Sequence, residues 1–303
     1  MFNNAPIAFF AYKRPEHTRR ALEALAQNEG ADKSELFIFC EGPKRAEDQE
    51  AIQQVRALAR SKQWCGSVQI IEREKNLGCA ASIMAGVTEI CEKYGRVIVI
   101  EDDLVVSPFF LDYMNQSLEV YAESYQVMQI SGYMFPITLP TEQETIFLPL
   151  ASAWGWATWH RAWKQFDPHM PGYTELKANK KLRHQFDING SFYFFAMLEA
   201  QRQGKIDAWD ICWYLSIFML GGLVLHPTHS LVSNIGFDGS GTHYRKKKVT
   251  SVVDTIYNSK IKVLPQPLVL DIEAIDLLAT HLRKVRQDES SFLRRLISRL
   301  IPA

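Results

Sequence analysis

The chain is poor in cysteine, and the cysteines that it has follow no pattern. Its 303 residues contain five, which are odd in number, widely spaced and without a C-x-x-C pair: Cys40, Cys65, Cys79, Cys91 and Cys212. This arrangement excludes a disulfide framework and a zinc module. Residues 1–6 also lack the basic and the long apolar regions of a signal peptide. We therefore expect a reducing, cytoplasmic location.

A net charge and a membrane-spanning run are absent as well. The 34 Lys and Arg residues balance 34 Asp and Glu residues, which argues against a protein built to coat nucleic acid. Between Ile211 and Phe237 there is no Asp, Glu, Lys or Arg, but only the part up to Leu225 is strongly apolar. A bilayer span needs about 20 predominantly apolar residues. The stretch instead predicts a buried helix that runs into a buried strand.

The first 130 residues alternate short apolar runs with amphipathic segments. The runs expected as strands are 7–10, 36–40, 68–71, 97–100 and 127–130, and helical spacing marks 15–26, 52–59, 80–94 and 108–121. Strands that are apolar throughout, separated by amphipathic helices, are typical of a parallel sheet covered on both faces. We therefore expect an α/β fold with a doubly wound, mostly parallel sheet. In such sheets, ligands bind outside the carboxyl ends of the strands.

The pattern changes after residue 131. Six of the seven tryptophans fall between residues 154 and 213, and the regular alternation ends. We expect an α/β half over 1–131, an aromatic-rich α+β half of the same domain over 132–248, and a C-terminal helical extension over 249–303. Residues 245–303 carry twelve basic and six acidic side chains, so the neutral total conceals an acidic body. The basic, amphipathic stretch 290–301 fits peripheral contact with an anionic membrane, or a helix docked on the body.

Three carboxylates follow the fourth predicted strand. Glu101, Asp102 and Asp103, here called the acidic triplet, come directly after the run 97–100. Adjacent carboxylates at the end of a buried strand repel one another unless something cationic lies beside them. A hard divalent ion such as Mg²⁺ or Mn²⁺, with diphosphate oxygens completing its shell, supplies that charge. The alternative is capping of the following helix, which explains one acid but not three.

The triplet is part of a longer stretch that resembles a known family. Residues 97–110, Val-Ile-Val-Ile-Glu-Asp-Asp-Leu-Val-Val-Ser-Pro-Phe-Phe, closely resemble the metal-binding segment of glycosyltransferases with the GT-A fold. The nearest likeness is to the branch of the mannoside N-acetylglucosaminyltransferases and to a bacterial group of sugar transferases. It extends over about residues 5–244 and is strongest over 97–110, 153–163 and 231–243. It implies metal-dependent, inverting transfer from a UDP-sugar to a hydroxyl of a glycan or lipid-linked glycan acceptor, as in bacterial cell-surface polysaccharide synthesis.

The resemblance also implies a role for individual residues. Asp103 would bind Mn²⁺ or Mg²⁺, and Glu101 and Asp102 would contact the sugar or the ribose. The other residues that it implies for the donor site are Tyr12 and Arg14 in the first-strand loop 11–15, Glu41 at the uracil base, Asn76 and Gly78 before the helix that flanks the donor, and Trp154, Gly155 and Trp156 along the donor sugar. For Trp154 and Trp156, burial in the core is the alternative.

An inverting sugar transferase needs a carboxylate as general base for the acceptor hydroxyl. Asp207 and Asp210 precede the uncharged stretch, and the Trp-Asp pair at 209–210 resembles the family's base motif. We therefore predict Asp210 as the base, with Asp207 as the second candidate. N-capping of the helix that follows is the alternative for each of them.

A glycine-rich segment, 233–243, ends at His243 and precedes a basic run. Its backbone N–H groups suit a phosphate. By resemblance, His243 would complete the metal shell and the basic run, with Lys246, would close over the diphosphate; a plain surface turn is the alternative. His226 and His229 have the spacing of a metal pair, but Pro227 prevents a regular helix there, so we expect core or edge histidines.

Two other functions remain open from the sequence. A nucleotidyltransferase would use a similar sheet and a divalent metal to form a nucleotide-sugar. It would favour a Gly-rich first loop, whereas residues 11–15 contain no glycine. A glycan-binding module would use the aromatic patch without turnover, but it would leave the acidic triplet unexplained.

Overall fold

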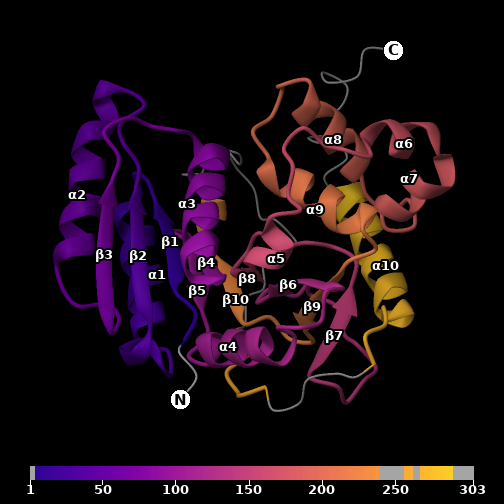
Figure 1. Ribbon diagram of the computed structural model, residues 1–303, viewed down its shortest axis with the longest axis horizontal. Helices are drawn as coiled ribbons and strands as arrows, with labels where there is room; N and C mark the ends of the chain where they lie inside the picture. The colour runs from indigo at the N-terminus through magenta and orange to yellow at the C-terminus, as the bar shows by residue number, and fades with distance from the viewer. Residues whose placement is uncertain (1–3, 239–255, 262–266, 289–303) are drawn as a thin grey trace.

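The computed structural model describes residues 4–238, 256–261 and 267–288. Its first half alternates strands and helices as the sequence predicts (Figure 1). The elements are β1 (Ile7–Ala11), α1 (Pro15–Ala26), η1 (Ala31–Lys33), β2 (Glu35–Cys40), η2 (Ala46–Asp48), α2 (Gln49–Arg60), β3 (Ser67–Glu72), α3 (Cys79–Tyr94), β4 (Arg96–Glu101), β5 (Leu104–Val106), α4 (Phe110–Val120) and β6 (Val127–Ser131). Each of the strands and helices predicted in this half is therefore confirmed to within a few residues.

The second half adds strands of both directions and most of the short helices. Its elements are β7 (Thr145–Leu148), β8 (Trp156–Trp159), α5 (His160–Trp163), α6 (Tyr173–Ala178), α7 (Lys180–Phe186), α8 (Phe194–Arg202), α9 (Trp209–Met219), β9 (Leu223–Pro227), β10 (Val232–Asn234), η3 (Gly236–Asp238) and α10 (Ile272–Asp288). Of the clustered tryptophans, Trp156 and Trp159 lie in the strand β8, whereas Trp163, Trp209 and Trp213 lie in the helices α5 and α9.

One sheet runs through both halves. Its eight strands have the order β3-β2-β1-β4-β8-β6-β9-β7. The pairs β3/β2, β2/β1, β1/β4 and β6/β9 are parallel, whereas β8 is antiparallel to both β4 and β6, and β7 is antiparallel to β9. The predicted α/β class and mostly parallel sheet are confirmed. A separate antiparallel pair, β5 with β10, leads away from the acidic triplet.

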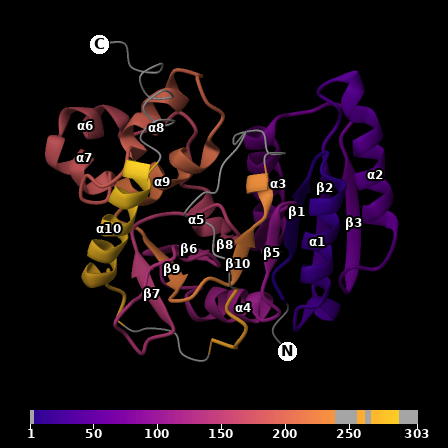
Figure 2. The same cartoon turned by 180° about the vertical axis from the view of Figure 1, so that it is seen from behind.

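Helices cover both faces of the sheet (Figures 1 and 2). Buried residues of α1, α2 and α4 pack against one face, in a cluster with Phe9, Ile38 and Ile100. Buried residues of α3, α5 and α9 pack against the other face, with Phe10 and Val99. The two faces alternate along each strand because successive side chains point to opposite sides. This double cover explains why the strands are apolar throughout.

Helix α9 and strand β9 account for the long uncharged stretch. Trp213 and Ile217 face the sheet, whereas Tyr214 and Leu215 belong to a third cluster in the second half. The predicted buried helix running into a buried strand is therefore confirmed. Among the residues that the structure describes, no helix has the length and apolar character that crossing a bilayer requires.

Two predictions concern histidines and cysteines. His226 is completely buried, and its Nδ1 and Nε2 lie 3.0 Å from the carbonyl oxygens of Tyr133 and Leu150. His229 is exposed, and its ring lies 5.1 Å from that of Tyr257. They are a core and an edge histidine, as expected. All five cysteines are free.

Helix α10 belongs to the body of the protein. Ala274, Leu278 and Ala279 are buried in the third cluster, which they share with residues of α6 to α9. The described part of the expected C-terminal extension is thus a docked helix, at the side of the second half (Figure 1). The stretch 290–301 lies outside the described residues.

We predict that Leu278→Ala destabilises the whole chain. Leu278 is completely buried, and truncation of such a leucine costs about 2–5 kcal/mol because it leaves a cavity. Urea unfolding followed by circular dichroism measures this loss. The matched control is Ile272→Ala on the same helix, where the side chain is 64% exposed and the expected change is within about 0.5 kcal/mol. Equal midpoints for Leu278→Ala and the native chain would contradict the docking of α10.

Candidate active site

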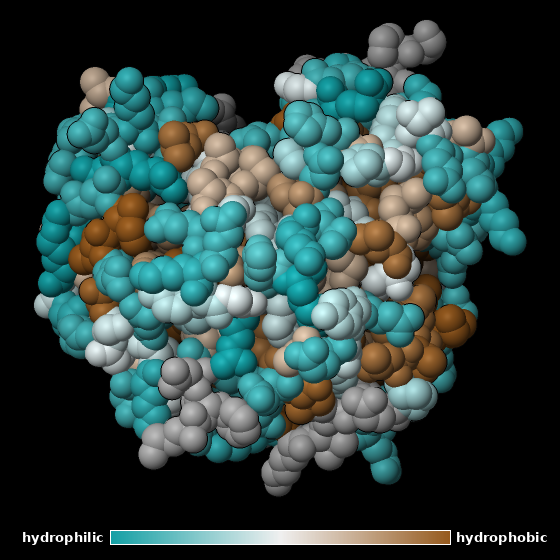
Figure 3. All heavy atoms as spheres, in the orientation of Figure 1, coloured by the Kyte–Doolittle hydropathy of each residue, from teal (hydrophilic) through white to brown (hydrophobic). Residues whose placement is uncertain are grey.

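The carboxyl ends of three central strands lie in register at one edge of the sheet. Phe10 of β1 is paired with Phe39 of β2 and with Glu101 of β4. The acidic triplet therefore lies beside the loop that follows β1. Strand β1 starts near the N-terminal mark and runs upward in Figure 1, and the surface is hollowed at this upper edge, between the two halves (Figures 1 and 3).

Arg14 holds two members of the triplet. Its Nη2 donates to Asp102 Oδ1 in a short ion pair and lies 3.0 Å from Asp103 Oδ2. Asp102 Oδ2 also accepts the backbone N–H of Tyr12, at 3.1 Å. Desolvation raises the pKa of Asp102, although the charge of Arg14 lowers it. The first-strand loop and the triplet are therefore joined by one guanidinium and one backbone hydrogen bond.

Glu101 is the member of the triplet with the least favourable surroundings. Desolvation, followed by the charges of Asp103, Asp102 and Asp210, raises the pKa of its carboxyl well above the usual range. Its Oε2 lies 3.9 Å from Cys79 Sγ, at the start of α3. The Glu101 carboxyl therefore binds a proton more readily than an ordinary glutamate does.

The chain that leaves β10 passes directly over Asp103. The backbone N–H of Ile235 donates to the carbonyl oxygen of Asp103 at 2.8 Å. A Cβ atom on Gly236 would lie 2.3 Å from Asp103 Oδ2 and 3.0 Å from Arg14 Nη1. A side chain at position 236 would therefore displace the Asp103 carboxylate or the Arg14 guanidinium. Gly236 was not among the predicted site residues, although its place in the glycine-rich segment was a signal for it.

Both candidate bases approach the same edge from the second half. Asp210 lies in the first turn of α9 and is close enough to the triplet to raise the pKa of Glu101. Asp207 is exposed, and its Oδ2 would be 3.5 Å from a Cβ on Gly78, the residue before α3. Five carboxylates thus gather here: Glu101, Asp102, Asp103, Asp207 and Asp210.

Glu41 is buried, and its carboxylate is engaged within the protein. Oε2 accepts the backbone N–H of Leu77 at 2.8 Å, and Oε1 accepts the hydroxyl of Ser82 at 2.6 Å. Arg73 Nε lies 3.0 Å from Oε1. These contacts give Glu41 a structural role at the turn before α3. The predicted contact of Glu41 with the uracil base of the donor stays a prediction.

Asn76 shapes the turn that Glu41 anchors. Its Nδ2 donates to the carbonyl oxygen of Gly42 at 3.1 Å, and its Oδ1 accepts the N–H of Gly78 at 3.0 Å. Gly78 has a φ of +85°, a conformation that other residues rarely adopt. The Asn76–Gly78 step therefore fixes how α3 begins beside the carboxylates.

Tyr12 and Lys13 turn away from the triplet toward η2. The Tyr12 hydroxyl donates to Asp48 Oδ2 at 2.8 Å, and Lys13 Nζ lies 2.6 Å from Asp48 Oδ1. Burial and the bond to Asp48 raise the pKa of Tyr12 to about 12. Lys13 lies in the first-strand loop 11–15 that the resemblance points to, whereas Asp48 belongs to no motif and was not singled out from the sequence.

The two tryptophans predicted for the donor sugar have different places. Trp154 is partly buried, with ring centroids 4.5 Å from Tyr133 and 5.6 Å from Phe237, close to η3. Trp156 has no exposed surface and packs 5.4 Å from Trp209 in the core. This burial favours the core alternative for Trp156, and its contact with a donor sugar stays a prediction.

Gly155 is required by packing. It has a φ of +63°, and a Cβ there would lie 2.9 Å from Val232 Cγ2 and 3.1 Å from Phe110. Its carbonyl oxygen accepts the N–H of Gly132 at 2.7 Å. The residue thus lets β8 approach β10 and α4 closely, and a contact with a sugar stays a prediction.

Metal coordination by the protein alone has no basis in the described residues. Within them, no three His, Cys, Asp or Glu side chains are placed to hold one ion. His243 and Lys246 lie outside the described residues. Asp103 fits an ion that takes one or two carboxylates and completes its shell with substrate phosphates, as Mg²⁺ does.

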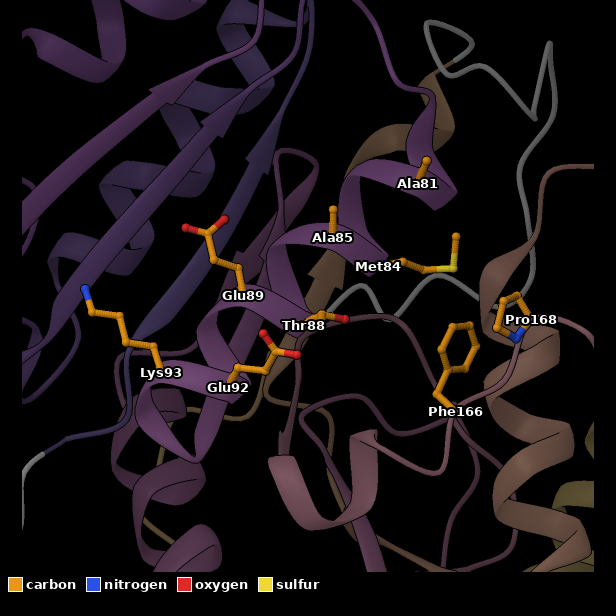
Figure 4. A pocket seen from close by; sticks show the side chains of 9 residues that line it. All are labelled: Ala81, Met84, Ala85, Thr88, Glu89, Glu92, Lys93, Phe166 and Pro168. Atoms are coloured by element: carbon orange, nitrogen blue, oxygen red, sulfur yellow. The ribbon is translucent and has the colours of Figure 1, made fainter.

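An open groove runs along the outer side of α3 (Figure 4). It has a volume of about 880 Å³, and Met84, Phe166 and Pro168 point toward one another across it. It starts at Ala81, one helical turn after Gly78, and reaches Lys93 at the far end of the helix. None of the five carboxylates at the sheet edge lines this groove.

Comparison with known proteins finds similarity at the level of structure. No protein-family model and no curated protein sequence matches the chain. The mannosyltransferase PcManGT from Pyrobaculum calidifontis, in complex with GDP-Man and Mn²⁺, is 12% identical over 73% of this chain and 74% of its own, with a TM-score of 0.39.

Two further solved structures are similar in the same way. GalNAc-T7 with UDP, GalNAc and Mn²⁺ is 9% identical over 75% of this chain, with a TM-score of 0.46, and the match spans 43% of its own length. Mouse xyloside xylosyltransferase 1, in an apo form, is 12% identical over 71% of this chain and 81% of its own, with a TM-score of 0.35. Similarity this low assigns neither a family nor an activity to this chain.

We predict that Glu101→Gln stabilises the protein when divalent ions are removed by a chelator. The neutral amide no longer repels Asp102, Asp103 and Asp210, and a gain of about 1 kcal/mol would raise the melting temperature by about 2–4 °C. The raised pKa of Glu101 gives the sign of the pH dependence. Above that pKa the native carboxylate is charged and the difference is largest; as the pH falls, the carboxyl is protonated and the difference shrinks.

Thermal melting at several pH values measures this effect. Glu89→Gln, on the exposed side of α3, is the matched control and should leave the melting temperature nearly unchanged. A Glu101→Gln variant that melts below the native protein at every pH would show that the ionised carboxylate has stabilising partners.

Proposed function

We propose that the chain is a metal-dependent glycosyltransferase of the GT-A type. It transfers a sugar, with inversion, from a UDP-sugar to a hydroxyl group of a glycan or lipid-linked glycan. The observation that carries the proposal is the gathering of five carboxylates from two distant segments at the carboxyl edge of β1, β2 and β4. Ligands of such sheets bind at this edge. The resemblance of residues 97–110 to the family's metal-binding segment gives the reaction class.

The surroundings of Asp103 suit a hard divalent ion. The Asp103 side chain keeps some solvent exposure, and its Oδ2 lies beside Arg14 Nη2 and the backbone of Gly236. Carboxylate oxygens are the ligands that Mn²⁺ and Mg²⁺ favour, and Asp103 is the residue that would hold the ion. The bound ion would neutralise the charge that develops on the diphosphate leaving group.

The chain's own carboxylates supply the remaining chemistry. The acceptor oxygen forms a bond to the anomeric carbon while the bond from that carbon to the UDP oxygen breaks. Asp210 takes the proton of the acceptor hydroxyl as general base. Helix α9 is packed on both sides, so it holds Asp210 in a fixed position; Asp207, exposed beside Gly78, is the second candidate.

The donor lies, in this proposal, between the first-strand loop and the start of α3. Tyr12, Arg14, Asn76 and Gly78 border that space. Trp154, partly buried and close to Phe237 of η3, would face the sugar. His243 and Lys246 keep their predicted roles at the metal and the diphosphate.

We predict that UDP binds with Mn²⁺ and that Asp103→Asn removes the metal dependence. Isothermal titration calorimetry of UDP, with Mn²⁺ and with a chelator, measures this. The affinity with Mn²⁺ should fall by more than about tenfold in the variant, because loss of even a residue that supports a metal ligand has that effect. Asp112→Asn on α4, away from this edge of the sheet, is the control. No heat from any UDP-sugar or UDP in the native protein would overturn the proposal.

We predict that Asp210→Asn abolishes transfer while donor binding stays unchanged. A positioned general base contributes about 10²–10⁴-fold to the rate, and that factor should be lost. Sugar transfer and UDP affinity are measured on the same preparations, with Asp207→Asn as the matched variant. Normal transfer by Asp210→Asn together with loss in Asp207→Asn would assign the base to Asp207.

A further inference from the structure

Arg14 lies where a metal ion would compete with it. One nitrogen, Nη2, bonds to Asp102 Oδ1 and lies 3.0 Å from Asp103 Oδ2. The side chains of Asp102 and Asp103 are 5% and 17% exposed, so little solvent shields the three charges. Asp103 is also the residue that carries the proposed metal. Asp103 Oδ2, an oxygen that could bind the metal, is thus already in contact with the guanidinium of Arg14.

The guanidinium is held firmly in this place. The carbonyl oxygen of Arg14 accepts the N–H of Thr18 at 2.9 Å and its hydroxyl at 2.8 Å, and Pro15 follows as the first residue of α1. On the other side, Nη1 faces Gly236, where a Cβ would lie at 3.0 Å. The start of α1 and the approach of η3 therefore enclose the side chain between them.

We propose that Arg14 is the resident counter-ion of the acidic triplet and competes with a divalent cation for Asp103. This inference rests on the proposed function. It gives Arg14 a role other than the direct donor contact that the sequence predicted. A divalent cation bound at Asp103 releases Oδ2 from Nη2, while the buried pair of Arg14 with Asp102 remains.

Two effects of removing the charge of Arg14 oppose each other. Without the guanidinium, a divalent cation is no longer repelled by a positive charge a few ångströms away, and at an effective dielectric constant of about 20 that repulsion is several times the thermal energy. The loss of a hydrogen bond that orients a ligand weakens metal binding by about 10–100-fold. Arg14→Gln keeps an N–H donor, so the first effect dominates.

The competition also makes metal binding depend on the donor. A diphosphate brings negative charge to the ion and offsets the repulsion by Arg14. The native protein therefore binds Mn²⁺ weakly alone and more tightly with UDP. In Arg14→Gln, which lacks the positive charge, UDP should increase the affinity for Mn²⁺ less than it does in the native protein. Arg14 acts here as a positioning residue and not as a group that touches the reacting atoms.

The test is a Mn²⁺ titration followed by electron paramagnetic resonance, with and without UDP. Arg14→Gln should bind Mn²⁺ alone about tenfold more tightly than the native protein, and UDP should improve its affinity less. Arg14→Lys, which keeps the charge, should stay near the native affinity. Arg19→Gln, on the exposed side of α1, is the matched control and should not differ from the native protein.

A Mn²⁺ affinity of Arg14→Gln equal to or below the native one would overturn the inference. If the variant does not fold, a crystal structure of the native protein with Mn²⁺ and UDP decides: the inference predicts that Nη2 is no longer within hydrogen-bond distance of Asp103 Oδ2, and a retained contact overturns it. Failure of the native protein to bind Mn²⁺ even with UDP is a different result, which overturns the proposed function itself.

Discussion

Repulsion among the carboxylates after β4 is the constraint that organises this edge of the protein. The β-branched run of β4 is buried and ends in Glu101, so the acidic triplet is fixed at the sheet edge whether or not its charges are balanced. Arg14 supplies the charge that the fold itself offers, and it does so from the first turn after β1. The start of α1 and the chain that leaves β10 both lie beside this guanidinium.

Helix α9 brings the second group of acids to the same edge. Its buried residues divide between the cluster under the sheet and the cluster of the second half, so the helix cannot rotate without disturbing both. Asp210 occupies its first turn, and Asp207 precedes it beside Gly78. The second half of the chain thus contributes more than cover for the sheet: it places two carboxylates opposite the triplet.

Much of this arrangement could be predicted from the sequence, because it depends on local patterns. Apolar runs such as 97–100 have the composition of buried strands, and the residues that follow parallel strands meet at one edge. Long-range packing could not be predicted. The spacing of Trp154, Trp156 and Trp159 suits a helix as well as a strand, and it does not reveal that β8 lies antiparallel between β4 and β6. Likewise, no motif reveals that Gly236 lies against Asp103, because the two residues are far apart in the chain.

The enclosure of α9 has a consequence for how this protein tolerates change over evolution. Trp209 and Trp213 pack with Trp156 and Trp163, and this aromatic group sets the position of the helix that carries Asp210. A change in the volume of any of these rings would shift α9 and therefore the position of the Asp210 carboxylate, even without direct contact between the ring and Asp210. Substitutions here should therefore be accepted in compensating pairs, with the sum of ring volumes kept while individual rings vary. The packing of these core rings and the position of Asp210 at the sheet edge are therefore expected to change together.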